Sequence, residues 1–146
     1  MICIEMSEKE LQNYLAGSIE RNGYKVIQQC VDDPTKFADI GECRTHSIFG
    51  IDIVAQKNNE LWIIEVKGQP NGGVASCSTF FMAGIGQIFT RMTTCGFPEG
   101  IHYSLAVPNT DCFAPSVRKL MGSPALPRNK LSIILVQDDG SFELVK

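Results

Sequence analysis

The sequence predicts one α/β domain, residues 1–146, built on a mixed β-sheet with helices against it. Apolar runs of strand length alternate along the chain with amphipathic segments of helix length, an order typical of α/β folds. Two of these runs are separated by Asn58-Asn59, a pair that suits the tight turn of an antiparallel hairpin. With 44% hydrophobic residues, a chain of 146 residues can bury a respectable core.

The first helix is expected to begin after Ser7, because Ser7 and Glu10 have the spacing of a capping box. Apolar residues then recur at helical spacing, and Gly23 is suited to end the helix. The run from Lys25 to Val31 has the character of a strand. Residues 32–49 are ambiguous and leave room for one extra strand.

The hairpin strands are predicted at Ile48–Gln56 and Leu61–Lys67. The glycine-rich segment 68–73 reads as a loop, which could close over a ligand or serve as a plain connection. A helix is expected near Thr79 to Thr94. Three antiparallel strands followed by a crossover helix should place the next strand parallel in a mixed sheet.

The last part of the chain completes this sheet. A fourth strand is predicted at Ile101–Val107, and a short helix should begin near Pro115 and end before Gly122. The closing strands are expected at Leu131–Val136 and Phe142–Val145.

Three charged residues lie inside the two hairpin runs, where buried strands are normally apolar. If Asn58-Asn59 is the turn, counting outward from it places Asp52 directly opposite Glu65. Because side chains alternate along a strand, Lys67 shares the face of Glu65. Two carboxylates and one ammonium group should therefore converge on one patch.

Directly opposed like charges destabilise a sheet, so this patch calls for a positive charge between the carboxylates. Lys67 supplies part of it, and hard oxygen ligands favour Mg²⁺ or Mn²⁺ for the remainder. A structural ion-pair network, without metal, is the alternative interpretation of the same residues.

Asp52, a gap of twelve residues and then Glu65-Val66-Lys67 resemble the signature of the PD-(D/E)XK nuclease superfamily, which includes restriction endonucleases and Holliday-junction resolvases. The match is good at Asp-Ile-Val-Ala and at Ile-Ile-Glu-Val-Lys-Gly, and it departs at Ile51, where the family name has a proline. The resemblance implies a restriction-endonuclease-like core of order αβββαβ over about residues 7–107. It also implies a metal-dependent nuclease that hydrolyses phosphodiester bonds, with DNA as the expected partner.

By the same resemblance, Asp52 and Glu65 would hold one or two Mg²⁺ (or Mn²⁺) ions with the backbone carbonyl of Val66. Lys67 would orient or deprotonate the attacking water. Gln87 would face the metal or the phosphate from the helix that follows, with Arg91 four residues later on the same helical face. The alternative for these two is the polar stripe of an amphipathic helix.

The first helix often supplies a further acid in such nucleases. Glu10 is the nearest candidate, with Gln12 as a replacement and Glu20 too far along, although the capping box already accounts for Glu10. His46 and His102 lack partners at ligand spacing, and we interpret both as non-catalytic.

The six cysteines include no CxxC pair, so the sequence predicts reduced, mostly buried thiols rather than a zinc or iron–sulfur site. These cysteines are Cys3, Cys30, Cys43, Cys77, Cys95 and Cys112. No apolar run approaches the length of a membrane span and no secretory signal is evident, so we expect a soluble cytoplasmic protein.

The net charge of −3 argues against tight nonspecific binding of DNA. Basic residues do concentrate late in the chain, at Arg118, Lys119, Arg128 and Lys130, where an ordinary solvated surface is the simpler interpretation. A nuclease-fold protein without hydrolysis, acting as a DNA-binding or assembly subunit, is the main alternative function. The sequence leaves open DNA versus RNA, endo versus exo action, and the oligomeric state, with a homodimer among the options.

Overall fold

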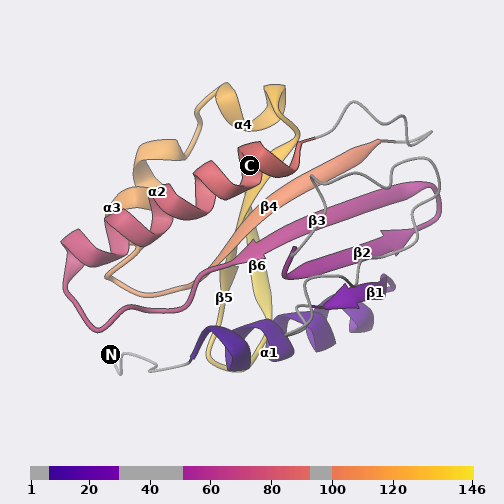
Figure 1. The fold of residues 1–146 in the computed structure, drawn as a ribbon, viewed down its shortest axis with the longest axis horizontal. Coiled ribbons are helices and arrows are strands. Elements are labelled where there is room, and N and C mark those ends of the chain that lie inside the picture. Colours follow the sequence, from indigo (N-terminus) through magenta and orange to yellow (C-terminus); the bar gives the residue numbers. More distant parts are fainter. Residues whose placement is uncertain (1–6, 30–50, 93–99) are drawn as a thin grey trace.

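The computed structural model of the protein describes residues 7–29, 51–92 and 100–146. Six strands within these ranges form one sheet in the order β1-β2-β3-β4-β5-β6. The helix α1 lies against one face of this sheet, and α2, α3 and α4 lie against the other (Figure 1). The elements are α1 Glu8–Arg21, β1 Lys25–Gln29, β2 Ile53–Lys57, β3 Glu60–Val66, α2 Val74–Arg91, β4 Ile101–Pro108, α3 Ala114–Leu120, α4 Ala125–Arg128, β5 Leu131–Val136 and β6 Phe142–Val145.

The sheet is mixed, as the sequence predicts. Strands β1, β2 and β3 form an antiparallel meander, and the crossover through α2 returns the chain to β4, which runs parallel to β3. β5 is parallel to β4, and β6 is antiparallel to β5. The parallel pairing brings the carboxyl ends of β3, β4 and β5 to one edge of the sheet. Glu65 and Lys67 lie at this edge, where the chain leaves β3.

The central strands are buried on both faces, which explains their apolar sequences. Ile63 and Leu105 belong to the core under α2, α3 and α4, whereas Ile64 and Ala106 belong to the core under α1. Glu65 lies between Ile64 and Val66, so by alternation it faces α2. Glu65 therefore projects into the more heavily covered layer of the protein.

The helix α1 begins where the capping box predicts. The Glu10 amide donates to the Ser7 hydroxyl at 3.2 Å, and the Ser7 amide donates to the Glu10 carboxylate at 3.3 Å. The helix ends at Arg21, and Gly23 follows with a φ of 91°, a conformation that glycine adopts without strain. Leu11, Leu15 and Ile19 bury one stripe of this helix.

Several boundaries differ from the sequence prediction. α2 begins at Val74 rather than near Thr79, because Cys77 in its second turn is fully buried and anchors this end of the helix. The short helix α4 was not anticipated. β2 begins at Ile53, whereas the predicted start at residue 48 lies outside the described residues. None of the helices in the described ranges has the length and apolar character to cross a bilayer.

The prediction of reduced thiols is wrong for two cysteines. Cys77 in α2 and Cys112 in the segment before α3 form a disulfide, with their Cα atoms 5.8 Å apart and a sequence separation of 35. Spacing rules detect local cysteine pairs, and this pair forms only because the fold brings α2 beside the end of β4. The bond fastens α2 to the start of α3. Cys3, Cys30, Cys43 and Cys95 lie outside the described residues.

Two glycines in α2 have different surroundings. A Cβ atom at Gly84 would lie 2.5 Å from the Leu105 Cδ1 and 3.2 Å from the Lys67 Cγ, so glycine at this position lets the helix lie close to β3 and β4. A Cβ atom at Gly86 would meet nothing within 4 Å. Close packing on the sheet therefore accounts for Gly84 but not for Gly86.

These surroundings predict opposite effects of the same substitution. Gly86→Ala should stabilise the protein by about 1 kcal/mol through helix propensity. Gly84→Ala gains the same term, but overpacking costs about 1–3 kcal/mol, so a net loss of up to ~2 kcal/mol is expected. Chemical denaturation of the two variants measures the difference. Stabilisation by both substitutions would contradict the close packing of α2 on the sheet.

Candidate metal and phosphate site

The hairpin has the register that the sequence predicts. Lys57 pairs with Glu60 across the Asn58-Asn59 turn, and Ile53 pairs with Ile64 at the other end. Asn58 has a φ of 55°, as a tight turn of this kind requires. Extending the register by one residue beyond Ile53 brings the chain at residue 52 level with residue 65.

Asp52 is fixed to the end of β3 by a hydrogen bond. The backbone N–H of Val66 donates to the Asp52 carboxylate oxygen Oδ2 at 2.8 Å. Charge-assisted bonds of this type are stronger than neutral ones and hold a carboxylate in one orientation. Asp52 is half-buried, and it lies just outside the ladder between β2 and β3. The carboxylate is therefore held next to the chain segment that carries Glu65 and Lys67.

Glu65 and Lys67 occupy the same face of β3. The side chain of Glu65 is only 3% exposed, an unusual burial for a carboxylate. Lys67 is half-buried, its backbone N–H donates to the Ala106 carbonyl at 2.9 Å, and its stem passes beside Gly84 of α2. The wall of α2 thus confines the lysine to the carboxyl edge of the parallel strands.

A third carboxylate reaches this site from α1. The pKa of Glu8 is raised, first by partial burial of its carboxyl group and then by the negative charge of Asp52, while the positive charge of Lys67 lowers it. The first turn of α1 rests on Gly68, where a Cβ atom would lie 2.8 Å from the Glu8 backbone nitrogen. Glu8, Asp52 and Lys67 therefore form one electrostatic cluster.

On α1, Glu8 is the acid coupled electrostatically to Asp52 and Lys67, whereas the candidate Glu10 is used in the capping box. Glu10 is bound to Ser7 in the capping box, and Glu8 and Glu10 are both exposed at the helix start. A sequence signal for Glu8 did exist, because it lies three and seven residues before Leu11 and Leu15 on the buried stripe of the helix. Gln12 is buried on the same side, 5% exposed.

For the other expected site residues, the structure shows fewer contacts with the carboxylate site. Val66 contributes its amide to Asp52, and the expected role of its carbonyl stays a prediction. Gln87 lies on α2, which covers the face of Glu65 and Lys67, but its side chain is exposed, and no hydrogen bond or ion pair found among the described residues joins it to them. The side chain of Arg91 and the whole of His46 lie outside the described part of the structure.

Two buried oxygen atoms near the same edge of the sheet have no hydrogen-bond partner among the described residues. One is the side-chain carbonyl Oε1 of Gln69, two residues after Lys67. The other is the hydroxyl Oγ1 of Thr110, two residues after the end of β4. Buried polar atoms are normally satisfied by protein, water or an ion. Sequence reasoning missed both residues, because neither belongs to a charged pattern.

The donor set fits a hard cation that keeps part of its water shell. In the described ranges, no three carboxylate, imidazole or thiol side chains lie close enough together to hold a metal ion on their own. Asp52 and Glu65 are adjacent oxygen donors, and Mg²⁺ is commonly bound by one or two carboxylates with water and substrate oxygens completing the shell. The unpartnered Gln69 oxygen adds an acceptor on the adjoining loop.

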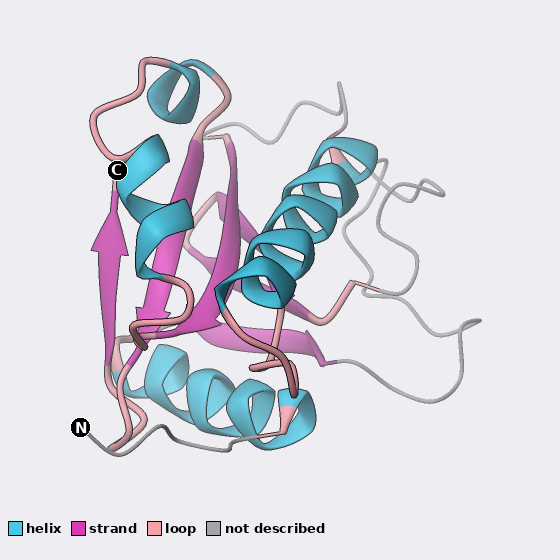
Figure 2. Ribbon diagram, turned by 90° about the vertical axis from the view of Figure 1, so that its left-hand side faces the viewer, coloured by secondary structure: helices cyan, strands magenta, loops and turns pink. Residues whose placement is uncertain are grey.

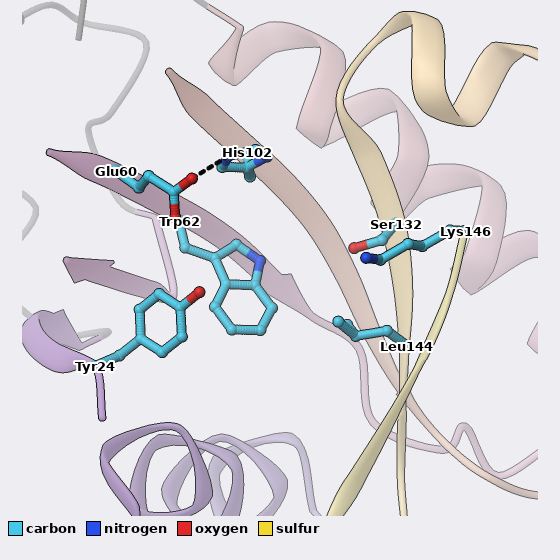
Figure 3. Close-up of a pocket in the computed structure, with 7 residues that line it drawn as sticks. All are labelled: Tyr24, Glu60, Trp62, His102, Ser132, Leu144 and Lys146. Atoms are coloured by element: carbon cyan, nitrogen blue, oxygen red, sulfur yellow. Dashed lines mark ion pairs between the residues drawn. The ribbon is translucent and has the colours of Figure 1, made fainter. Parts of the chain in front are cut away.

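A cavity of about 260 Å³ lies elsewhere, on the α1 face of the sheet and at the opposite ends of β3 and β4 (Figure 3). Trp62 forms part of its wall and donates from Nε1 to the buried Ser104 hydroxyl at 2.8 Å. The His102 imidazole lies 3.5 Å from the Glu60 carboxylate across its mouth. This cavity is separate from the carboxylate cluster, whose chemistry makes the better candidate for function. It is lined by Tyr24, Glu60, Trp62, His102, Ser132, Leu144 and Lys146.

Comparison with known proteins establishes the fold. No protein-family model matches this chain, and no curated protein matches it. The structure is similar to that of an FdxN element excision controlling factor protein from Anabaena variabilis, with a TM-score of 0.55 and 16% identity over 93% of this chain and 98% of that one. An XisH family protein from Nostoc punctiforme matches over the same shares, with 16% identity and a TM-score of 0.47. At such low identity, the similarity to the first structure concerns the fold alone.

The raised pKa of Glu8 gives a pH-dependent prediction. In the folded protein Glu8 binds its proton more tightly than in the unfolded chain, so its contribution to stability is lost as the pH rises through the folded pKa. Glu8→Gln should therefore raise the melting temperature at neutral pH. The gain should vanish as the pH falls below the ordinary glutamate value of 4.5.

Thermal melting from about pH 3.5 to pH 8 measures this effect. Glu143→Gln, which removes an exposed carboxylate on β6, provides the control and should show no comparable gain. A gain from Glu8→Gln that persists unchanged at low pH would contradict a raised pKa of Glu8 caused by burial and by Asp52.

Proposed function

We propose that the protein is a metal-dependent nuclease that hydrolyses phosphodiester bonds in DNA. The observation that carries this proposal is the hydrogen bond that fastens Asp52 beside Glu65 and Lys67 at the carboxyl edge of parallel strands. Two carboxylates and a lysine ammonium group are the group types that a hard cation and a phosphate need. The resemblance of these residues to the PD-(D/E)XK signature supports the same function.

In this proposal Asp52 and Glu65 would hold Mg²⁺ or Mn²⁺, with Glu8 close enough to add negative charge. When bound, the metal would polarise the phosphate and lower the pKa of a coordinated water. Lys67 would donate hydrogen bonds to the attacking water and to a phosphoryl oxygen. Its ammonium group stabilises negative charge as that charge grows toward the transition state.

The position of Lys67 suits this role. The Cγ of Lys67 lies beside Gly84 of α2, so the first part of its side chain packs between α2 and the end of β3. Gln87, exposed on the same helix, is proposed as an auxiliary contact to phosphate rather than as an essential group.

A second candidate is a nuclease-fold protein that binds DNA without cleaving it. The name of the Anabaena variabilis neighbour describes control of the excision of a DNA element rather than cleavage. The described residues also lack a group of three potential metal-binding side chains. Binding of DNA with no cleavage in Mg²⁺ or Mn²⁺ would favour this function over the first.

Substitution of the two carboxylates tests the nuclease proposal. Asp52→Asn and Glu65→Gln should abolish cleavage in a panel of linear, circular, single-stranded and branched DNA with Mg²⁺ or Mn²⁺. Asparagine can still accept the Val66 N–H, and each amide relieves repulsion between like charges, so the melting temperature without metal should hold or rise.

The control is Glu60→Gln, which removes a carboxylate from the same strand at the far end of the hairpin. It should cleave as the wild type does. A large loss of stability in metal-free buffer for both Asp52→Asn and Glu65→Gln would instead identify the carboxylates as parts of a structural ion-pair network.

A further inference from the structure

The charge of this protein is distributed very unevenly along the chain. Residues 112–137 contain four cations and no acid, so this segment carries +4. Because the whole chain carries −3, the remainder carries −7. These cations therefore lie in a stretch without acids that is bounded by Asp111 and Asp138. The four cations are Arg118, Lys119, Arg128 and Lys130.

The fold turns these cations outward. In α3, Ser116 and Val117 are buried toward the sheet, which leaves Arg118 and Lys119 exposed on the outer side. Arg128 is exposed in the last turn of α4. In the described part of the chain, these three residues form no ion pair with a carboxylate. We call Arg118, Lys119 and Arg128 the basic face.

Lys130 is not included in the basic face. It has a φ of 51°, and its Nζ lies 2.9 Å from the position that a Cβ atom would take at Gly100. Its side chain therefore packs beside Gly100, at the start of β4. Replacement of Lys130 would disturb this packing as well as the surface charge.

The basic face is attached to the same layer of the protein as the candidate site. The helices α2 and α3 lie side by side over the sheet face that carries Glu65 and Lys67, and α4 continues this layer (Figure 2). The segment between β4 and α3 leaves the same edge of the sheet as the segment after β3. The Cys77–Cys112 disulfide ties α2 to the start of α3. The start of α3 is thus held near the carboxyl edge that carries the site, and the basic face extends from there along α3 to Arg128, next to the start of β5 at the amino ends of the parallel strands.

We propose that the basic face contacts the phosphate backbone of duplex DNA bound at the carboxylate site. The inference rests on the proposed function, because it concerns the substrate of that site. Arg and Lys side chains without carboxylate partners are the groups that neutralise backbone phosphates, and they do so regardless of base sequence. Cations at helix C-termini also favour the helix dipole, but this effect does not account for the absence of acids across residues 112–137.

The salt dependence of DNA binding tests this inference without requiring cleavage. Affinity for a fluorescent duplex of about 20 base pairs is measured by anisotropy in EDTA over a series of KCl concentrations. Arg118→Gln/Lys119→Gln/Arg128→Gln should weaken binding and reduce the slope of log K against log salt by about 2.7, or ~0.9 for each lost phosphate contact. The single variant Arg118→Gln should reduce it by about 0.9.

The matched control removes three exposed cations from the opposite edge of the sheet, as Arg21→Gln/Lys25→Gln/Lys57→Gln. It should retain the wild-type slope, although the change in net charge is the same. Equal salt slopes for the basic-face variant and the control variant would overturn the inference. If both variants also cleave DNA with the salt dependence of the wild type, the basic face is rejected as a DNA contact and the proposed nuclease function remains intact. A wild type that binds DNA but fails to cleave would reject the nuclease function and leave the basic face standing.

Discussion

The carboxylate site depends on the hydrogen bond between the Val66 amide and Asp52. The antiparallel register of the hairpin brings the chain at Asp52 beside the end of β3, and this bond fixes the carboxylate there although Asp52 lies outside the strand ladder. Glu65, almost fully buried, lies at the same level with a second carboxylate. Like charges on neighbouring positions repel one another, and Lys67, on the same face as Glu65, contributes positive charge there.

On each face of the sheet, a glycine allows a helix to pack close to the carboxylate site. α1 rests its first turn on Gly68, which brings Glu8 toward Asp52, and α2 rests on β3 and β4 at Gly84, which confines Lys67. In each case a Cβ atom would push the helix away from the sheet. The charged groups are therefore positioned by close backbone packing as much as by their own hydrogen bonds. This arrangement explains how one strand end can collect groups from two faces of the sheet.

Local patterns predicted much of this structure. The capping box, the Asn58-Asn59 turn and the two closing strands follow from short-range rules, and the register set by that turn places the chain at Asp52 beside Glu65. Helical spacing places Glu8 on the buried stripe of α1, but its position near Asp52 could not be predicted, because it arises where α1 meets Gly68, 60 residues later in the sequence. The Cys77–Cys112 disulfide depends similarly on the packing of α2 beside β4.

The central claim is that the carboxylates at the end of the hairpin form a site for a divalent cation. Thermal melting of the wild type and of Asp52→Asn, each with and without Mg²⁺ or Mn²⁺, tests it most directly, since a ligand of the native state stabilises that state by mass action. Repeating the measurement with uncleavable DNA covers a site that fills only with substrate. A metal-dependent rise in the wild type that is absent in Asp52→Asn is the predicted result. An equal rise in both proteins would contradict the assignment of Asp52 as a metal ligand.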